Sequence, residues 1–290
     1  MNPKSKISAC IMVKNEEKNL PGLLKSIEGV VDEIVAIDHE STDRTRSILT
    51  IAGVKIISMP DKTKEYLLPV EVSKPKGAKP TKKWVDIERT LLNDNASGEW
   101  ILHMDADERL TEELRSELPK LAQQNDYDVI WLFSKHFYAP EKWFKHGFYA
   151  PHREPRFYRK SCGINWNVRI HESPKIEGRL LYSNLSYDHL YYTAGEERIR
   201  QKHEIYLKIE RKQKKQYLSQ NPLVKWLFIF LGYPVYFLYG FFMRLAFLDG
   251  WVGVTTNHFL SQYFARAGYL EIVAKKKLGI IKYNTFLEED

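Results

Sequence analysis

The stretch ISACIMVKNEE at residues 7–17 decides the fold, because a nearly unbroken apolar run passes directly into polar residues. The run over residues 7–13 has the composition of strands that are buried on both faces, as in parallel sheets. The next segment, residues 20–27, carries its apolar side chains at helical spacing: Leu20, Leu23, Leu24 and Ile27. We therefore predict a strand followed by a helix at the start of the chain.

The same order of strand and helix continues along the front half of the chain. Short apolar runs predict strands at residues 33–37, 54–57 and 100–104, and periodic segments predict helices at residues 42–52, 85–96 and 111–124. This alternation predicts an α/β fold with a mainly parallel, Rossmann-like sheet. Ligands of such sheets bind at the carboxyl ends of the strands. Polar residues follow three of the predicted strands there: Lys14, Asn15 and Glu16, then Asp38, then Asp105 and Asp107.

Composition and missing motifs exclude several classes of function. The chain has 290 residues, a formal net charge of +7 and two cysteines, neither of them in a CxxC pair, which excludes a disulfide scaffold and a cysteine zinc site. No GxGxxG follows the first predicted strand, and neither GxxxxGKS/T, HExxH nor GxSxG occurs, so the sequence supports neither a dinucleotide fold nor a P-loop. The first residues lack the apolar core of a signal peptide, so we expect no secretion by that route.

The remaining candidates for chemistry are carboxylates. Asp105 and Asp107 flank a single residue after a predicted strand, so both side chains can point to the same side of a tight turn. Two carboxylates placed in this way suit a hard divalent cation, which prefers oxygen ligands and often shares them with substrate phosphates. The alternative is an acidic helix N-terminus that complements the helix dipole. Spacing alone does not separate these interpretations.

Three ordered motifs carry a resemblance to a known family. They are MVKNEE at residues 12–17, EIVAID at 33–38 running into STDRT at 41–45, and GEWILHMDADE at 98–108. Together they resemble the family 2 glycosyltransferases of the GT-A fold, and in particular the bacterial branch that acts on lipopolysaccharide core or other lipid-linked acceptors. Further segments look like family landmarks: REPRFYR at 153–159, VRIHE at 168–172 and FLDGW at 247–251.

The resemblance implies roles for individual residues. Lys14, Asn15 and Glu16 would line the nucleotide pocket, and Asp38 would hold the uracil or ribose. Asp105 would lie near the ribose and with Asp107 form the metal site, where Mg²⁺ or Mn²⁺ bridges the diphosphate and stabilises the leaving group. Arg89 would contact phosphate, although Thr90 stands where the family often has Asn. His39 and Glu40 stand where relatives commonly have small residues, which would alter the pocket beside the base.

The reaction that the resemblance implies is a single displacement at the anomeric carbon, which needs a general base for the acceptor hydroxyl. Glu172 is the first candidate, and Glu108 and His171 are the reserves. The alternative for Glu172 is a structural ion pair with Arg153, Arg156 or Arg169.

Two further positions on predicted strands have more than one interpretation. Arg156 and Arg159 alternate along a predicted strand, where they would either contact phosphate or form a solvated face. His103, between apolar neighbours, is interpreted as a core histidine rather than a ligand.

The C-terminal part has a different composition. Residues 198–215 contain eight Lys or Arg against two acids, and residues 226–243 form an aromatic-rich stretch of 18 residues without a charge. These features predict a basic helix and apolar helices that lie on the cytoplasmic face of an anionic membrane. A single membrane span and burial against a partner subunit remain alternatives. A nucleic-acid partner is not expected, because no binding module accompanies the basic helix.

We therefore expect a GT-A catalytic domain at residues 1–192 and a membrane-associated helical tail at 193–290. The expected enzyme is an inverting glycosyltransferase that moves a hexose, with glucose the first choice, from a UDP-sugar to a lipid-linked or lipopolysaccharide-type acceptor. Its expected place is the cytoplasmic face of the inner membrane, as a peripheral or monotopic protein. Two alternatives stay open: a sugar-nucleotide-processing or nucleotidyl enzyme, and a non-catalytic membrane-surface binding protein on the same fold.

Overall fold

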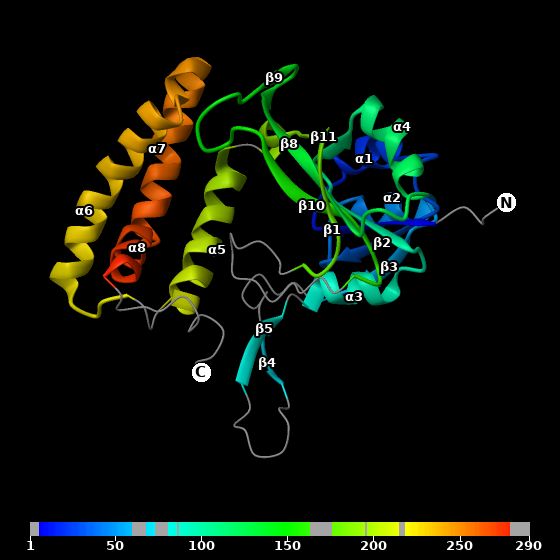
Figure 1. The fold of residues 1–290 in the computed structure, drawn as a ribbon, viewed down its shortest axis with the longest axis horizontal. Coiled ribbons are helices and arrows are strands. Elements are labelled where there is room, and N and C mark those ends of the chain that lie inside the picture. Colours follow the sequence, from blue (N-terminus) through cyan, green and yellow to red (C-terminus); the bar gives the residue numbers. More distant parts are fainter. Residues whose placement is uncertain are drawn as a thin grey trace.

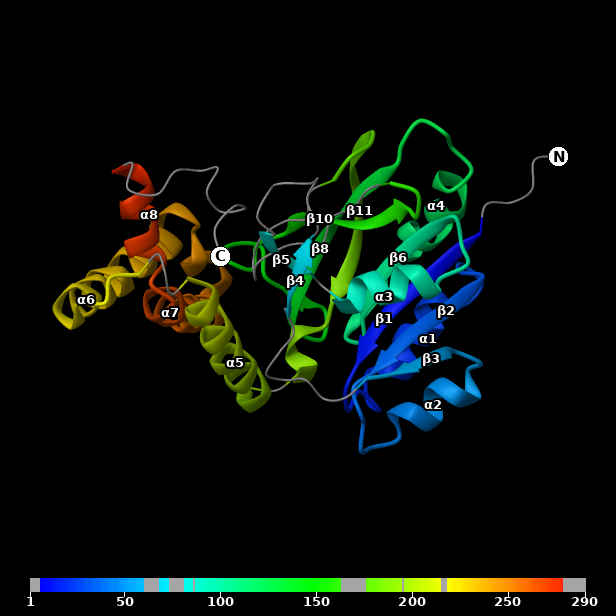
Figure 2. The same ribbon diagram turned by 90° about the horizontal axis from the view of Figure 1, so that it is seen from below.

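A computed structural model of the chain describes residues 6–59, 68–72, 81–85, 87–162, 176–194, 196–214 and 218–278. In these residues, a large sheet with flanking helices forms one body, and a group of C-terminal helices stands beside it (Figures 1 and 2). The predicted helix at 85–96 begins later than expected, at Ile87, because Val85 ends a strand. The predicted helix at 111–124 ends at Leu121, two residues after Pro119.

The sheet combines a parallel half with an antiparallel extension. Four parallel strands stand in the order β3 (Lys55–Ser58), β2 (Glu33–Asp38), β1 (Ile7–Val13) and β6 (Trp100–Asp105). The order continues with β10 (His152–Arg159), β8 (Val129–Ala139), β11 (Leu180–His189) and β7 (Glu108–Leu110), and β9 (Lys142–Trp143) pairs with β8. Because β10 is antiparallel to both neighbours, β8 and β11 again share the direction of the first four strands. A separate hairpin joins β4 (Leu68–Val72) to β5 (Thr81–Val85).

Helices cover both faces of the parallel half. On one face lie α1 (Leu20–Ile27), α2 (Thr45–Ile51) and α4 (Glu112–Leu121), and on the other lies α3 (Ile87–Asn95). Side chains of β1 alternate between the two cores: Ala9 and Ile11 pack with α1, and Cys10 packs with α3. This confirms the predicted fold class, a mainly parallel Rossmann-like α/β sheet with flanking helices, followed by C-terminal helices.

The C-terminal helices pack on one another through small residues. They are α5 (Glu196–Lys214), α6 (Pro222–Leu238) with a π-helical turn at Tyr239–Met243, α7 (Gly250–Arg266) and α8 (Tyr269–Lys277). Gly232 of α6 faces Ala265 of α7, and a Cβ at position 232 would lie 3.3 Å from the Ala265 Cβ. In the part of the chain that the structure describes, the helical segment Pro222–Met243 alone is long and apolar enough to cross a membrane.

Candidate active site

The carboxyl ends of three parallel strands meet at one edge of the sheet, as the sequence predicts. The register pairs Val13 of β1 with Asp38 of β2, and Met12 of β1 with Asp105 of β6. Asp38 and Asp105 therefore lie on either side of the end of β1, and the turn that follows β1 begins between them. The strand-end residues that sequence reasoning singled out are thus brought together.

The turn after β1 is tied to the turn after β2. Asn15 has a left-handed backbone with φ of 54°, its amide donates to Ser41 Oγ at 3.0 Å, and its Oδ1 accepts from the Thr42 amide at 2.8 Å. The Glu16 amide donates to Thr45 Oγ1 at 2.7 Å. Asn15 and Glu16 therefore shape the edge of the sheet through their own hydrogen bonds, whereas Lys14, between Asn15 and β1, is partly exposed.

Asp38 lies beneath this edge rather than on it. Its side chain is almost fully buried, and its two oxygens accept from the Ser41 amide at 3.2 Å and from Arg46 Nη1 at 3.3 Å. The neighbouring His39 is also buried, with its Nε2 3.5 Å from Glu88 Oε1 on α3. A ligand reaches the Asp38 carboxylate only where Arg46 or the 39–41 turn leaves room for it.

The turn of residues 105–108 presents two carboxylates and buries a third. The Asp105 side chain is 41% exposed, and Asp107 Oδ2 lies 3.3 Å from His189 Nε2 of β11. Glu108 is fully buried and accepts from the Asp105 amide and from Arg156 Nη2, both at 2.8 Å. Burial raises the pKa of Glu108 to about 8, and the charge of Arg156 opposes that rise. Both Glu108 oxygens face donors and neither is exposed, which suits a residue that holds the turn better than a base that must reach an acceptor.

A divalent cation fits the donors of this turn. Asp105 and Asp107 offer partly exposed oxygen ligands, and Mg²⁺ is commonly held by one or two carboxylates together with substrate phosphates. Among the described residues no group of three or more metal-binding side chains occurs, so phosphates or residues outside the description would complete the coordination. Burial disfavours a charged His189, but the hydrogen bond and charge of Asp107 raise the pKa of His189 above its usual value.

Arg156 is buried and lies close to three carboxylates. The sequence suggested only a phosphate contact or a solvated strand face for this residue. Its Nη2 lies 2.8 Å from Glu108 Oε1 and 3.8 Å from Asp105 Oδ2, and its Nε lies 2.8 Å from Glu154 Oε2. A buried arginine with three carboxylates explains why so many acids coexist at this edge. The solvated strand face is therefore wrong for Arg156, whose side chain is 12% exposed, whereas its contact with phosphate stays a prediction.

A cluster of rings that sequence reasoning missed adjoins Asp107. The ring of His189 lies 4.7 Å from that of His136 on β8, which lies 5.2 Å from the ring of Tyr149. The Tyr149 hydroxyl donates to the Tyr191 hydroxyl at 2.7 Å. No local motif marks these residues, because the pairing of β8 with β11 joins positions that lie more than fifty residues apart. Only a tertiary contact map could have found them.

The remaining predicted residues divide between the core and undescribed positions. His103 is buried with Nε2 3.3 Å from Asn93 Oδ1, and burial lowers its pKa well below the usual value, which confirms the core histidine. Arg89 is partly buried on α3. The candidate base Glu172 and its reserve His171 lie outside the described residues.

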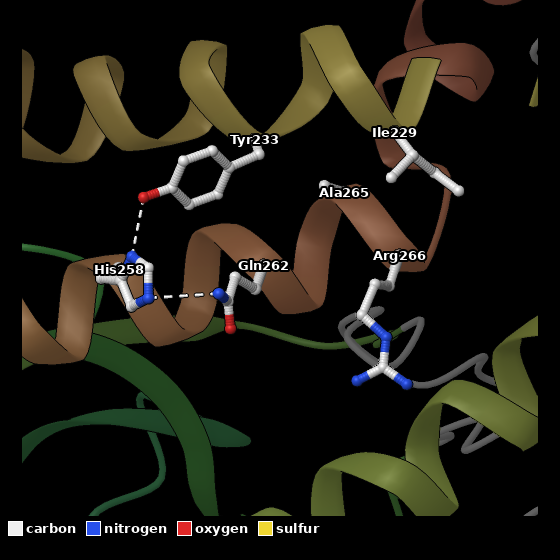
Figure 3. A pocket seen from close by; sticks show the side chains of 6 residues that line it. All are labelled: Ile229, Tyr233, His258, Gln262, Ala265 and Arg266. Carbon is white, nitrogen blue, oxygen red and sulfur yellow. Dashed lines mark hydrogen bonds between the residues drawn. The ribbon is translucent and has the colours of Figure 1, made fainter. Parts of the chain in front are cut away.

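A shallow cavity of about 440 Å³ lies away from this edge, between α6 and α7. Tyr233 Oη lies 2.7 Å from His258 Nδ1, and Gln262 Nε2 lies 3.1 Å from His258 Nε2 (Figure 3). Arg266 lines the same cavity one helical turn after Gln262 and pairs with Glu204 of α5. The described residues that line this cavity include no carboxylate. We therefore place the candidate active site at the sheet edge, where the strand ends bring several carboxylates close to the buried Arg156.

Comparisons with known proteins agree with the motifs. No family model matches the chain. An uncharacterized glycosyltransferase of Rickettsia bellii is 25% identical over 95% of this chain and 87% of its own length. The chain spans only 36% of a 29% identical Rickettsia felis relative, also an uncharacterized glycosyltransferase. The lipopolysaccharide core biosynthesis glycosyltransferase LpsC of Rhizobium meliloti is 27% identical over 62% of this chain and 61% of its own length.

Solved structures give more distant matches. The portion of S. aureus TarS that comprises its residues 1–349, in complex with UDP, has a TM-score of 0.43 and 14% identity, with 96% of this chain and 93% of that portion covered. Glucosyl-3-phosphoglycerate synthase of Mycobacterium tuberculosis has a TM-score of 0.29 and 22% identity, with 45% and 44% covered. Taking the ordered motifs and the curated relatives together, the chain resembles the family 2 glycosyltransferases, and glycosyltransferase activity is what these comparisons support.

Proposed function

We propose that the chain is an inverting glycosyltransferase that transfers a hexose, with glucose the first choice, from a UDP-sugar to a lipid-linked or lipopolysaccharide-type acceptor. The observation that carries this proposal is the partly exposed pair Asp105 and Asp107 at the carboxyl end of β6, held in place by buried Glu108 and Arg156. The similarity to LpsC, named for lipopolysaccharide core biosynthesis, supports the acceptor class.

The proposed roles follow the geometry. Asp107, with Asp105, would hold Mg²⁺ or Mn²⁺, which when bound neutralises charge on the diphosphate leaving group. Asp38, Lys14 and the turn of Asn15 and Glu16 would hold the nucleoside, and Arg89 on α3 would contact phosphate. The acceptor oxygen forms a bond to the anomeric carbon while the bond from that carbon to the diphosphate oxygen breaks. The acceptor proton passes to a base, for which Glu172 is the first candidate and His171 the reserve.

Binding of UDP is expected to depend on a divalent cation. In calorimetry on the full-length chain, UDP with Mn²⁺ should bind at least about tenfold more tightly than UDP with a chelator, a difference of about 1.4 kcal/mol. GDP and CDP serve as matched controls and should bind more weakly than UDP. Absence of binding by every nucleotide would instead favour a non-catalytic membrane protein. Cleavage of the UDP-sugar between its phosphates, independent of any acceptor, would favour a nucleotide-processing enzyme.

We also propose that the C-terminal helices lie on the cytoplasmic face of the inner membrane. The side chains of Trp226 and Phe230 are 65% and 61% exposed and stack with ring centroids 5.3 Å apart on α6. Exposed apolar patches of this kind mark interaction sites, and aromatic residues favour the headgroup boundary. Three lysines at 275–277 end α8 and suit an anionic surface.

Vesicle binding tests the membrane proposal. The double variant Trp226→Ala and Phe230→Ala should bind vesicles containing anionic phospholipid at least about tenfold more weakly, because each side chain contributes about 1.5–3 kcal/mol when it leaves water. Ile51→Ala is the matched control, since Ile51 is 87% exposed on α2 within the sheet-forming part. If the wild-type protein does not bind vesicles and forms a stable dimer, a partner subunit covers α6 instead of a membrane.

A further inference from the structure

The chain segment 144–150, between β9 and β10, is held by residues that connect the π-helical turn at Tyr239–Met243 to α7. Its consecutive amides of Lys145 and His146 donate to Asp249 Oδ2 at 3.0 and 2.9 Å, and the next amide, that of Gly147, donates to the Arg244 carbonyl at 2.7 Å. His146 Nδ1 lies 2.9 Å from Asp249 Oδ1. Three successive backbone donors of this segment thus end on residues about a hundred positions later in the chain.

The contact is close as well as hydrogen-bonded. The Asp249 side chain is only 6% exposed, and Arg244 Nε donates to the Gly147 carbonyl at 3.1 Å. Gly147 has φ of 74°, and a Cβ there would lie 3.3 Å from the Ala246 Cβ. The Asp249 side chain makes no capping hydrogen bond to the described residues of α7, although it immediately precedes that helix. The Asp249 carboxylate therefore accepts hydrogen bonds from segment 144–150 and does not cap α7.

Segment 144–150 leads directly to the candidate active site. Its Tyr149 contacts His136 and Tyr191, and the His136 ring contacts His189, which lies 3.3 Å from Asp107. In the sheet order, β1 and β2 lie on one side of β6, and β8 and β11 lie on the other. The ring cluster therefore lies across from the strand ends that we assign to the nucleotide, on the side left for the acceptor.

We propose that Asp249 is a positioning residue for transfer: it fixes segment 144–150 so that Tyr149 and the adjoining rings form the acceptor side of the site next to Asp107. This inference rests on the proposed glycosyltransferase function. It makes the C-terminal helices part of the active site as well as the membrane-facing part of the protein. The Asp249 carboxylate accepts hydrogen bonds from two backbone amides and lies within hydrogen-bond distance of the His146 ring nitrogen. These contacts order segment 144–150, which lies between β9 and β10 and belongs to neither strand.

The test compares Asp249→Ala with Asp249→Asn, because asparagine keeps an oxygen that can accept the two amides. Asp249→Ala should speed hydrogen exchange of the amides in segment 144–150 at least tenfold, raise the acceptor KM at least tenfold, and leave Mn²⁺-dependent UDP affinity within twofold. Asp249→Asn should recover most of the loss. Thr255→Ala, on the exposed face of α7, is the matched control and should change neither quantity.

Gly147→Ala provides a second route if Asp249→Ala does not fold, because it disturbs the same segment at a left-handed position without touching Asp249. It should likewise raise the acceptor KM more than it changes UDP affinity. Unchanged exchange and unchanged acceptor KM in Asp249→Ala would overturn the inference, and so would an equal loss of UDP affinity. If wild-type protein binds no nucleotide, the proposed function fails, whereas faster exchange in Asp249→Ala would still establish the contact that holds segment 144–150.

Discussion

Replacing Asp107 by Asn is expected to lower the rate of sugar transfer by about a thousandfold or more while leaving the fold intact. The substitution keeps the size of the side chain but removes the charge that would hold a divalent cation, whose stabilisation of a leaving group is worth several kcal/mol. Asp107 is partly exposed, and asparagine keeps an oxygen that can face His189 Nε2, so the thermal midpoint should shift by a few degrees at most.

The measurement is initial transfer rate against Mn²⁺ concentration, with UDP affinity measured in parallel. Asp107→Asn should lose both the rate and the dependence of UDP binding on Mn²⁺. Asp94→Asn is the matched control, because Asp94 is exposed on α3, outside the turn of residues 105–108. If Asp107→Asn transfers sugar at the wild-type rate, Asp107 is not a metal ligand and the 105–108 turn is an acidic structural turn.

The front half of the fold was predictable because its signals are local. Each parallel strand is a mainly apolar run that ends in a polar residue or is followed by one, so Asp38 and Asp105 could be placed at the same sheet edge from sequence alone. The strand β5 shows the limit: Val85 fits a helical pattern, but pairing with Leu68 of β4 makes it the end of a strand. Long-range pairing overrides local preference there.

The proposed acceptor side of the site was not predictable in the same way. His136 and His189 come together through the register of β8 with β11, and Asp249 meets His146 across about a hundred residues. The motif at residues 247–251 identified a family landmark without indicating what it contacts. Likewise, a charged strand such as residues 152–159 does not reveal from sequence that Arg156 points inward to Glu108.

That buried pair leads to the second large effect. Arg156→Ala is expected to lower the free energy of unfolding by about 3–5 kcal/mol, because removing one partner leaves a buried carboxylate without its counter-charge. Glu108 is fully buried and Glu154 also pairs with Arg156, so two carboxylates lose their guanidinium at once. Arg156→Lys should lose less, since it keeps the charge but not the planar fork of donors.

The free energy of unfolding that Arg156→Ala loses should also depend on pH, and the charges of Arg156 and Glu108 determine the direction of that dependence. Arg156 lowers the pKa of Glu108, which burial raises to about 8, so removal of Arg156 raises that pKa further. A carboxyl whose pKa is higher in the folded state contributes stability that is fully present below its unfolded value, about 4.3, and is lost as the pH rises through the folded value. Unfolding by urea in chelator-containing buffer should therefore show a larger deficit for Arg156→Ala at pH 8 than at pH 5.

Arg153→Ala separates this charge effect from a general weakening of β10. Arg153 lies on the same strand, but its guanidinium donates to the Ser183 carbonyl and to Asn184 Oδ1, which are both uncharged, so its loss should cost about 1 kcal/mol and show little dependence on pH. A deficit for Arg156→Ala that is equal at pH 5 and pH 8 would mean that Glu108 stays in one protonation state throughout. In that case packing and the amide of Asp105 hold the turn that carries Asp105 and Asp107, and the charge of Arg156 does not.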